Sequence, residues 1–350
     1  MTLLGFLWWS SLALGAAALA WMIWLILARL VRARRDARLG LDQARMRRLF
    51  LEIMEGHVDV ARQLKAPTRR ARLTAEAVLD IAGLVRGHER ERLVAALSGL
   101  GVEERLRRRL GRGSKAGRIA AVEALAVFPA PANAAAIRAA LSRARDPEFR
   151  VAALNALLAL DEAPPLWDLL ADVASRGLQD SLLYESVVRT LVARSPDQAL
   201  AVFTDPDASP VMRTIVADAL GRAGDYRAVP TLMAAADGAE LELRIACVRA
   251  LGVLAHPAAE PAILSGLADG AWEVRAAAAE AVGRIGLVTA APRLVQALAD
   301  PVWWVRFRSG EALNALGDKG VASLRLAADV DQDVVRRAAS LALAERGVSV

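Results

Sequence analysis

The stretch that decides the fold runs from Asp269 to Gly317 and contains one phrase twice. Residues 269–286 read DGAWEVRAAAAEAVGRIG, and residues 300–317 read DPVWWVRFRSGEALNALG. In each copy an Asp in a predicted turn is followed by a Val-Arg pair, a run of small residues, an apolar residue and a Gly. The apolar residues recur at three- and four-residue steps, which indicates a helix with one apolar face.

The same phrase recurs along most of the chain. An Arg followed six residues later by Ala, and seven later by Leu or Val, occurs at Arg118, Arg150, Arg213, Arg244, Arg275, Arg306 and Arg336. The last four intervals are 31, 31, 31 and 30 residues, and Tyr184 occupies the place of the missing Arg between Arg150 and Arg213. A period near 31 with two helices per unit is typical of an all-α solenoid.

The phrase D-x-x-x-x-V-R followed by A-L-x-x-L-G resembles HEAT-repeat proteins, over roughly Arg90 to Val350. We therefore expect a HEAT-like α-solenoid of helix pairs over residues 69–350, most regular from residue 118. The resemblance implies that the second helix of each pair lines the concave face. It also implies a scaffold that presents a surface to partner proteins.

Three recurrent residue types have expected structural roles. Pro230, Pro261 and Pro292 suit the first turn of a first helix, where a missing N–H costs nothing. Gly residues should end the second helices, and Asp residues should cap the second helices. The arginines should pair with an Asp of their own or of the next turn. The Gly residues are Gly221, Gly252, Gly283, Gly286 and Gly317, and the Asp residues are Asp146, Asp237, Asp269, Asp300 and Asp331.

Residues 1–28 contain no Lys, Arg, Asp or Glu. This run is long enough for a helix that crosses a bilayer, and it lacks the basic start and the cleavage site of a secretory signal. We therefore expect an N-terminal transmembrane helix. The arginines after the run predict that its C-terminal end faces the cytoplasm. The membrane-surface residues would be Arg29, Arg32, Arg34, Arg35 and Arg38. This topology is a single pass through the inner membrane, with the N-terminus outside and the solenoid in the cytoplasm.

Residues 29–68 are predicted to form a basic juxtamembrane helix and linker. The arginines of this segment could rest on anionic headgroups, or its apolar stripe could cap the first repeat. Residues 29–118 hold 23 basic and 11 acidic residues, whereas the remainder to residue 350 holds 22 basic and 28 acidic. The densest basic cluster lies between Arg105 and Arg118. Lipid, an acidic patch on a partner and plain solvation all remain open for it.

The sequence offers no arrangement typical of catalysis. GRGSKAG at Gly111–Gly117 matches neither phosphate-loop pattern, and His57, His88 and His256 lack metal-ligand spacing. Cys247 lies among small residues of a predicted second helix, so we expect it in the core. We therefore expect no catalytic residue, metal, cofactor or small-molecule substrate. We also expect no nucleic-acid binding, because the basic surface does not continue along the repeats.

Five side chains near two helix starts form the candidate partner-binding surface: Trp272, Trp303, Trp304, Phe307 and Arg308. Aromatic residues and Arg are enriched where binding energy concentrates. Because neighbours on a helix point about 100° apart, we expect one of the two adjacent tryptophans to lie in the core.

The sequence thus predicts a non-catalytic, membrane-anchored scaffold for protein–protein interaction. The resemblance to anchored bacterial HEAT proteins suggests a membrane-associated enzyme complex as the partner, such as an envelope or exopolysaccharide glycosyltransferase system. One alternative is a regulator that binds anionic lipid through residues 29–118. Another is an enzyme or accessory module similar to the HEAT-like bilin lyases or DNA glycosylases.

Overall fold

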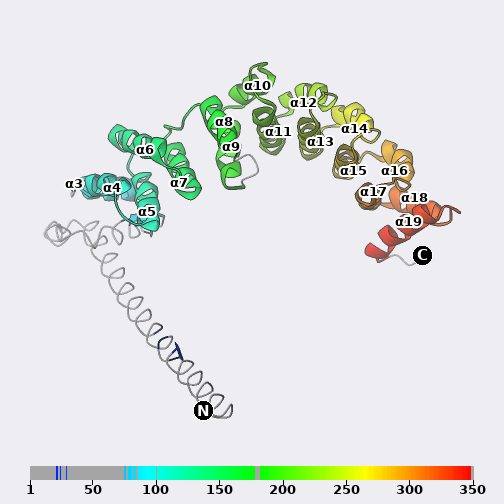
Figure 1. Cartoon of the computed structure of the whole chain (residues 1–350), viewed down its shortest axis with the longest axis horizontal. Coiled ribbons are helices and arrows are strands. Elements are labelled where there is room, and N and C mark those ends of the chain that lie inside the picture. The colour runs from blue at the N-terminus through cyan, green and yellow to red at the C-terminus, as the bar shows by residue number, and fades with distance from the viewer. Residues whose placement is uncertain are drawn as a thin grey trace, which may run out of the picture. The chain divides into compact units, whose positions relative to one another are not determined.

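The computed structural model describes residues 86–99, 101–177 and 182–347, with isolated positions between 21 and 29 and between 75 and 83. All regular secondary structure in these ranges is helical (Figure 1), as the repeat pattern predicts. The chain divides into two compact units, Met1–Ala163 and Pro164–Val350.

The predicted membrane anchor and the predicted juxtamembrane segment lie outside the described residues, apart from Trp21, Met22, Trp24 and Arg29. These four side chains are exposed. Among the residues that the structure describes, no helix has both the length and the apolar character needed to cross a bilayer.

The described part of the first unit consists mainly of two stacked helix pairs. Helix α4 packs on α5, α6 packs on α7, and α5 also packs on α7. Their shared core contains Leu106, Leu125, Phe128, Ile137 and Phe149. The helices are α3 (His88–Gly99), α4 (Val102–Leu110), α5 (Lys115–Leu125), α6 (Pro131–Arg143) and α7 (Pro147–Ala159).

The second unit is a row of helix pairs. Its first helices are α8 (Leu166–Ser175), α10 (Pro196–Thr204), α12 (Val229–Ala236), α14 (Glu260–Gly266), α16 (Ala291–Ala297) and α18 (Asp318–Ala328). Its second helices are α9 (Leu182–Arg194), α11 (Pro210–Ala223), α13 (Leu241–Leu254), α15 (Trp272–Ile285), α17 (Trp303–Ala315) and α19 (Asp333–Glu345). Within this unit, α11, α13, α15 and α17 lie side by side along the inner side of the curved row (Figure 1).

The recurrent prolines lie where the sequence predicts them. Pro230, Pro261 and Pro292 each occupy the first turn of a first helix. A short 3₁₀ helix precedes each of these helices: η3 (Tyr226–Ala228), η4 (Pro257–Ala259) and η5 (Val288–Ala290). The missing proline N–H therefore breaks no helical hydrogen bond.

The apolar residue seven positions after each repeat Arg forms the centre of the core. Leu220, Leu251, Val282 and Leu313 are fully buried. Burial of a side chain of this size contributes roughly 1.5–3 kcal/mol relative to exposure. One helix pair has no second surface to cover these residues, so the neighbouring pairs supply it.

The recurrent glycines have a different role from the predicted one. Gly221, Gly252 and Gly283 lie inside α11, α13 and α15, not at their ends. A Cβ atom on Gly252 would lie 2.8 Å from Ala281 Cβ and 3.0 Å from Ala281 Cα on the next second helix. These positions are therefore Gly because consecutive second helices approach too closely for a side chain. Gly286 alone of the five follows its helix directly as a left-handed C-cap (φ 78°), and Gly317 has φ 70° just before α18.

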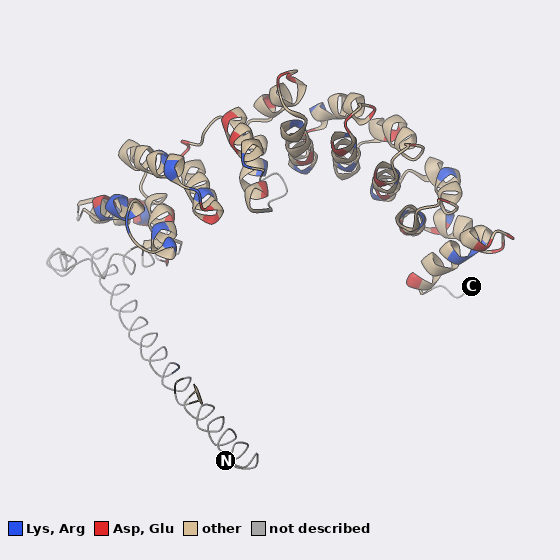
Figure 2. Cartoon of the chain, in the orientation of Figure 1, with Lys and Arg blue, Asp and Glu red and all other residues tan. Residues whose placement is uncertain are grey.

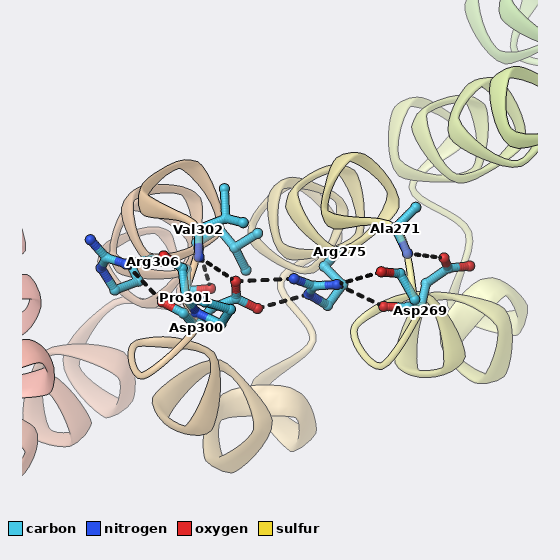
Figure 3. Close-up of polar contacts among 10 residues, drawn as sticks. Asp269, Ala271, Arg275, Asp300, Pro301, Val302 and Arg306 are labelled. Carbon is cyan, nitrogen blue, oxygen red and sulfur yellow. Dashed lines mark hydrogen bonds and ion pairs between the residues drawn. The ribbon is translucent and has the colours of Figure 1, made fainter.

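The repeat arginines form a ladder of polar contacts (Figure 3). The Nη1 of Arg275 donates to the carbonyl oxygens of Asp269 (2.9 Å) and Gly270 (3.1 Å) in the turn before its own helix. Its Nε and Nη2 donate to the Asp300 carboxylate at 2.7 and 3.1 Å, in the turn of the next repeat. This guanidinium therefore clamps two successive repeats together, in agreement with the predicted pairing to an Asp of the next turn.

Arg244 repeats this arrangement one unit earlier, with Asp269 as the acidic partner at 3.1 Å. The Asp side chains also organise their own turns. Asp269 accepts from the N–H of Ala271 at 2.7 Å, and Asp300 accepts from that of Val302 at 2.8 Å. Each of these bonds joins an Asp side chain to the N–H two residues further on. The prediction that these two Asp residues cap the second helices is therefore wrong. Asp146 is the true N-cap, since it accepts from the N–H of Phe149.

Three boundaries in the same unit lack the clamp among the described residues: Arg306 and Asp331 are present but form no ion pair, and at the other two boundaries one of the two partners is replaced. The acidic partner stands 25 residues after its Arg, and the residue at this distance from Arg213 is Gly238. Arg213 instead donates to the carbonyl of Phe203 at 3.0 Å. One repeat earlier, Tyr184 replaces the Arg and is buried, and its hydroxyl has no hydrogen-bond partner in the described part of the chain.

The close approach of α13 and α15 predicts that Gly252→Ala destabilises the second unit. Ala favours a helix interior over Gly by about 0.5–1 kcal/mol, but overpacking against a backbone costs about 1–3 kcal/mol. Gly270→Ala is the control, because a Cβ at Gly270 would meet no atom within 4 Å and the φ of this residue is not positive. Thermal unfolding followed by circular dichroism should show a lower midpoint for Gly252→Ala alone. Equal midpoints for the two variants would contradict the packing argument.

The clamp predicts that Asp300→Asn lowers stability in a pH-dependent way. Burial raises the pKa of Asp300, but hydrogen bonds from Arg275 and Val302 and the charges of Arg275 and Arg306 outweigh it, so the net pKa lies below the ordinary 3.8. The ionised form therefore stabilises the fold above pH 3.8, and this contribution is lost as the pH falls through the lowered pKa. At pH 7 we expect a loss of about 1.5–3 kcal/mol.

The control for this prediction is Asp331→Asn. Asp331 stands 25 residues after Arg306, but Arg306 and Asp331 form no ion pair in the described residues. Chemical unfolding between pH 2 and 7 should show a gap between wild type and Asp300→Asn that closes at low pH. An equally large effect of Asp331→Asn would indicate that the clamp is not the cause.

Candidate functional site

Three of the predicted partner-binding side chains form one aromatic cluster in the first turns of α17. The Trp303 ring stacks on Phe307 at 5.1 Å between centroids, and it meets Trp304 edge-on at 4.8 Å. Trp304 also meets Phe307 edge-on at 5.9 Å. The three rings therefore contact one another pairwise, although solvent surrounds much of the surface of the two tryptophans.

Both adjacent tryptophans are exposed, which corrects the expectation that one would be core. Trp303 and Trp304 are each 47% exposed. The core position at the start of α17 belongs to Val305, which is fully buried. Two large apolar side chains at the surface of one helical turn are unusual in a monomeric domain and typical of interaction sites.

The other two predicted residues lie less centrally. Trp272, 37% exposed, occupies the equivalent position on α15 and makes no ring contact with the cluster among the described residues. The Arg308 guanidinium lies 6.0 Å from the Phe307 ring centroid and pairs with Glu311 at 2.8 Å. Its charge is thus partly neutralised within the unit.

A groove of about 340 Å³ runs between α17 and α19 beside the cluster. Trp303 and Phe307 line one wall, and Val334 and Leu341 line the other. Gly310 lines it as well and packs against α19, since a Cβ there would lie 2.8 Å from Ala342 Cβ. We call this feature, together with Trp304, the aromatic groove. It is an apolar trough of a size and character suited to the side chains of another protein.

The sequence-based reasoning missed the α19 wall of the aromatic groove. Val334 is 40% exposed and Leu341 is 45% exposed. A signal was present at Leu341, which stands five residues after Arg336. The corresponding residue in every other Arg-anchored unit is polar: Glu123, Asn155, Asp218, Arg249, Glu280 and Glu311.

Most of the basic cluster between Arg105 and Arg118 is engaged within its own unit. Arg107 pairs with Glu104 at 2.8 Å and donates to the buried Asn133 at 2.6 Å. Lys115 pairs with Asp146 and Glu148 at 2.8 and 2.9 Å. Arg118 donates to the carbonyl of Leu110 and lies over the Phe149 ring at 4.4 Å. These contacts favour a structural role for the basic cluster over a lipid-binding role.

The Gly111–Gly117 segment is a helix start. Ser114 caps α5 by accepting from the N–H of Gly117 at 3.3 Å, and the Arg109 side chain packs against Gly117 and donates to its carbonyl oxygen at 3.2 Å. A Cβ on Gly117 would lie 2.5 Å from this guanidinium. The glycine thus makes room for an arginine of the same unit.

The remaining polar groups include one thiol and many ion pairs. Cys247 is buried as predicted, and burial raises the pKa of its thiol to about 12, so the thiolate is scarce at neutral pH. Across the described residues, no three His, Cys, Asp or Glu side chains gather in a way that could hold a metal ion. Basic and acidic residues are interspersed along the helices of the second unit (Figure 2), where many of them pair with each other.

Comparison with known proteins identifies the repeats. The family model for HEAT repeats matches residues 234–314 and, overlapping with these, residues 260–344. No curated protein matches the chain.

The chain is also similar to solved all-helical structures. Human deoxyhypusine hydroxylase with glycerol is 21% identical, covers 83% of this chain and 96% of its own, and has a TM-score of 0.30. An engineered protein is 18% identical, with 88% and 95% covered and a TM-score of 0.34. A Kap121p mutant is 13% identical, with 84% of this chain but only 41% of its own covered and a TM-score of 0.42.

The matched residues extend from within α12 to within α19 and include both clamps, the contact of Gly252 with Ala281 and the aromatic side chains of the groove. Residues 234–344 of this all-α chain therefore match HEAT repeats.

Proposed function

We propose that this chain is a non-catalytic scaffold that binds a partner protein through the aromatic groove. The observation that carries the proposal is the exposed cluster of Trp303, Trp304 and Phe307 beside a groove lined by Val334 and Leu341. Rigid aromatic side chains bury much apolar area on binding and lose little conformational freedom. Arrays of HEAT repeats commonly serve as surfaces for protein partners, which agrees with this use.

The rim of the aromatic groove adds polar contacts around the apolar centre. Arg306, Arg337 and Glu345 line the groove. Arg306 is anchored through Nη1 to the carbonyls of Asp300 and Pro301 at 2.7 and 3.0 Å. An apolar centre with a charged rim is the usual anatomy of a protein–protein interface.

The scaffold would act at a membrane. This part of the proposal rests on the sequence of residues 1–28, which is apolar and uncharged, and on the arginines that follow it. The solenoid would then lie in the cytoplasm, with the N-terminus outside. The partner would be a membrane-associated enzyme complex, for which an envelope or exopolysaccharide glycosyltransferase system is our candidate.

A site-specific crosslink tests the role of the aromatic groove. A photoreactive residue in place of Trp304 should capture one membrane-associated enzyme, identified by mass spectrometry. The same residue in place of Tyr226 is the control, because Tyr226 is also exposed but lies on η3 and contacts only His256 among aromatic rings of the described residues. Equal capture from both positions, or only lipid adducts from position 304, would argue against the groove as the docking site.

A charge reversal tests the membrane topology. Changing Arg32, Arg34, Arg35 and Arg38 together to Glu should scramble the orientation, because retained positive charge marks the cytoplasmic side. Protease treatment of intact spheroplasts should leave the wild-type solenoid protected and digest a fraction of the variant. Full protection of the variant would contradict the proposed topology, and digestion of the wild type would reverse it.

A further inference from the structure

A second groove lies in the same unit, away from the aromatic groove. It is formed by α9, α11 and α13, and its volume is about 790 Å³. Its lining residues come from the stretch between Val173 and Arg249 and include none of the residues of the aromatic groove. Binding sites for ligands commonly have volumes of about 300–1,000 Å³.

The floor of this groove is aliphatic. Val188 of α9, Ile215 and Ala219 of α11, and Ile245 and Ala246 of α13 all line it. It therefore crosses three helices, which makes it an elongated surface for an elongated apolar occupant.

The charged residues of the groove fall into two groups. Arg222 pairs with Glu185 at 2.9 Å and with Asp218 at 3.0 Å, so these three side chains largely neutralise each other. Glu242 and Arg249 also line the groove, and neither forms an ion pair within the described ranges. These two exposed charges remain available to an occupant, as do those of Glu240 and Arg189.

Glu242 and Arg249 have a defined arrangement on α13. Glu242, Ala246 and Arg249 follow each other at four- and three-residue steps, so they share one face of the helix. The seven residue steps from Glu242 to Arg249 span about 10 Å at 1.5 Å per residue. Along this face the groove therefore presents an acid, an aliphatic floor and a base in that order. Glu240 strengthens the acidic end, and Arg189 of α9 adds a second base to the lining.

The groove also coincides with the two boundaries at which a clamp residue is replaced. Tyr184 stands in place of the Arg on α9, and Gly238 stands in place of the acidic partner of Arg213. Where the clamps exist, between α13, α15 and α17, the charged residues of the turn are already paired. The groove over α9, α11 and α13 therefore lies where the ladder is interrupted.

We propose that this groove binds a peptide segment of a partner protein that carries an aliphatic residue between a basic and an acidic residue. The acidic residue pairs with Arg249, the basic residue pairs with Glu242, and the aliphatic side chain rests on Ile215 and Ile245. A span of about 10 Å corresponds to three residues of an extended peptide at about 3.3 Å each. It corresponds to about seven residues of a helical peptide.

Peptide display on the full chain tests this proposal. The selected peptides should carry Lys or Arg and Asp or Glu, about three or about seven residues apart, around an aliphatic residue. A synthetic peptide with this consensus should bind the wild type in a fluorescence anisotropy titration. Binding should weaken at least about tenfold, which is about 1.4 kcal/mol, in a Glu242→Arg/Arg249→Glu double variant. A peptide with its two charges exchanged should recover affinity for that variant.

Two controls keep this test interpretable. Glu242 and Arg249 are exposed, so the double variant should unfold at the wild-type temperature. Trp304→Ala should leave peptide binding unchanged, which separates this groove from the aromatic groove. The proposal is overturned if no peptide is enriched, if the enriched peptides lack the charge pair, or if the double variant binds the original peptide as well as the wild type does.

Discussion

The close stacking of consecutive second helices is the constraint on which the second unit depends. Each helix pair has an apolar face that it cannot cover alone, and its neighbour covers it only at short range. The contact of Gly252 with Ala281 shows how short this range is. A stack of this kind gains stability from nearest neighbours, so each boundary between repeats needs its own specific contacts.

The clamps supply such contacts from polar groups. The guanidinium of Arg275 donates hydrogen bonds both to carbonyl oxygens of one turn and to the carboxylate of the next. The planar geometry of Arg suits both tasks at once, which Lys could not perform. As a result, two successive turns are tied to each other, and α17 begins directly after the second of them.

Much of this architecture could be predicted from the chain alone, because a repeated phrase reports every unit at once. The 31-residue period, the prolines in first turns and the pairing of Arg with an Asp of the next turn all follow from local rules. The glycines could not be assigned correctly, because a Gly near a helix end fits both a C-cap and a close contact. Only the position of Ala281 on the neighbouring helix separates the two roles.

The candidate site could be predicted only in part, for a related reason. Trp303, Trp304 and Phe307 stand out on one helix, but Val334 and Leu341 belong to the next repeat and are ordinary residues in its sequence. The groove over α9, α11 and α13 could not be predicted from the sequence, because the effect of a missing contact depends on the packing of both neighbouring helices.

The fixed distance between each clamping arginine and its acid has a consequence for how such a chain can change length. Arg244 reaches Asp269 and Arg275 reaches Asp300 over the same 25 residues. Duplication of a whole 31-residue unit that contains both partners keeps this 25-residue spacing. An insertion of a single residue between the two partners shifts one of them out of reach. The clamps therefore favour growth of the chain by whole repeats over insertions of other lengths between an Arg and its Asp.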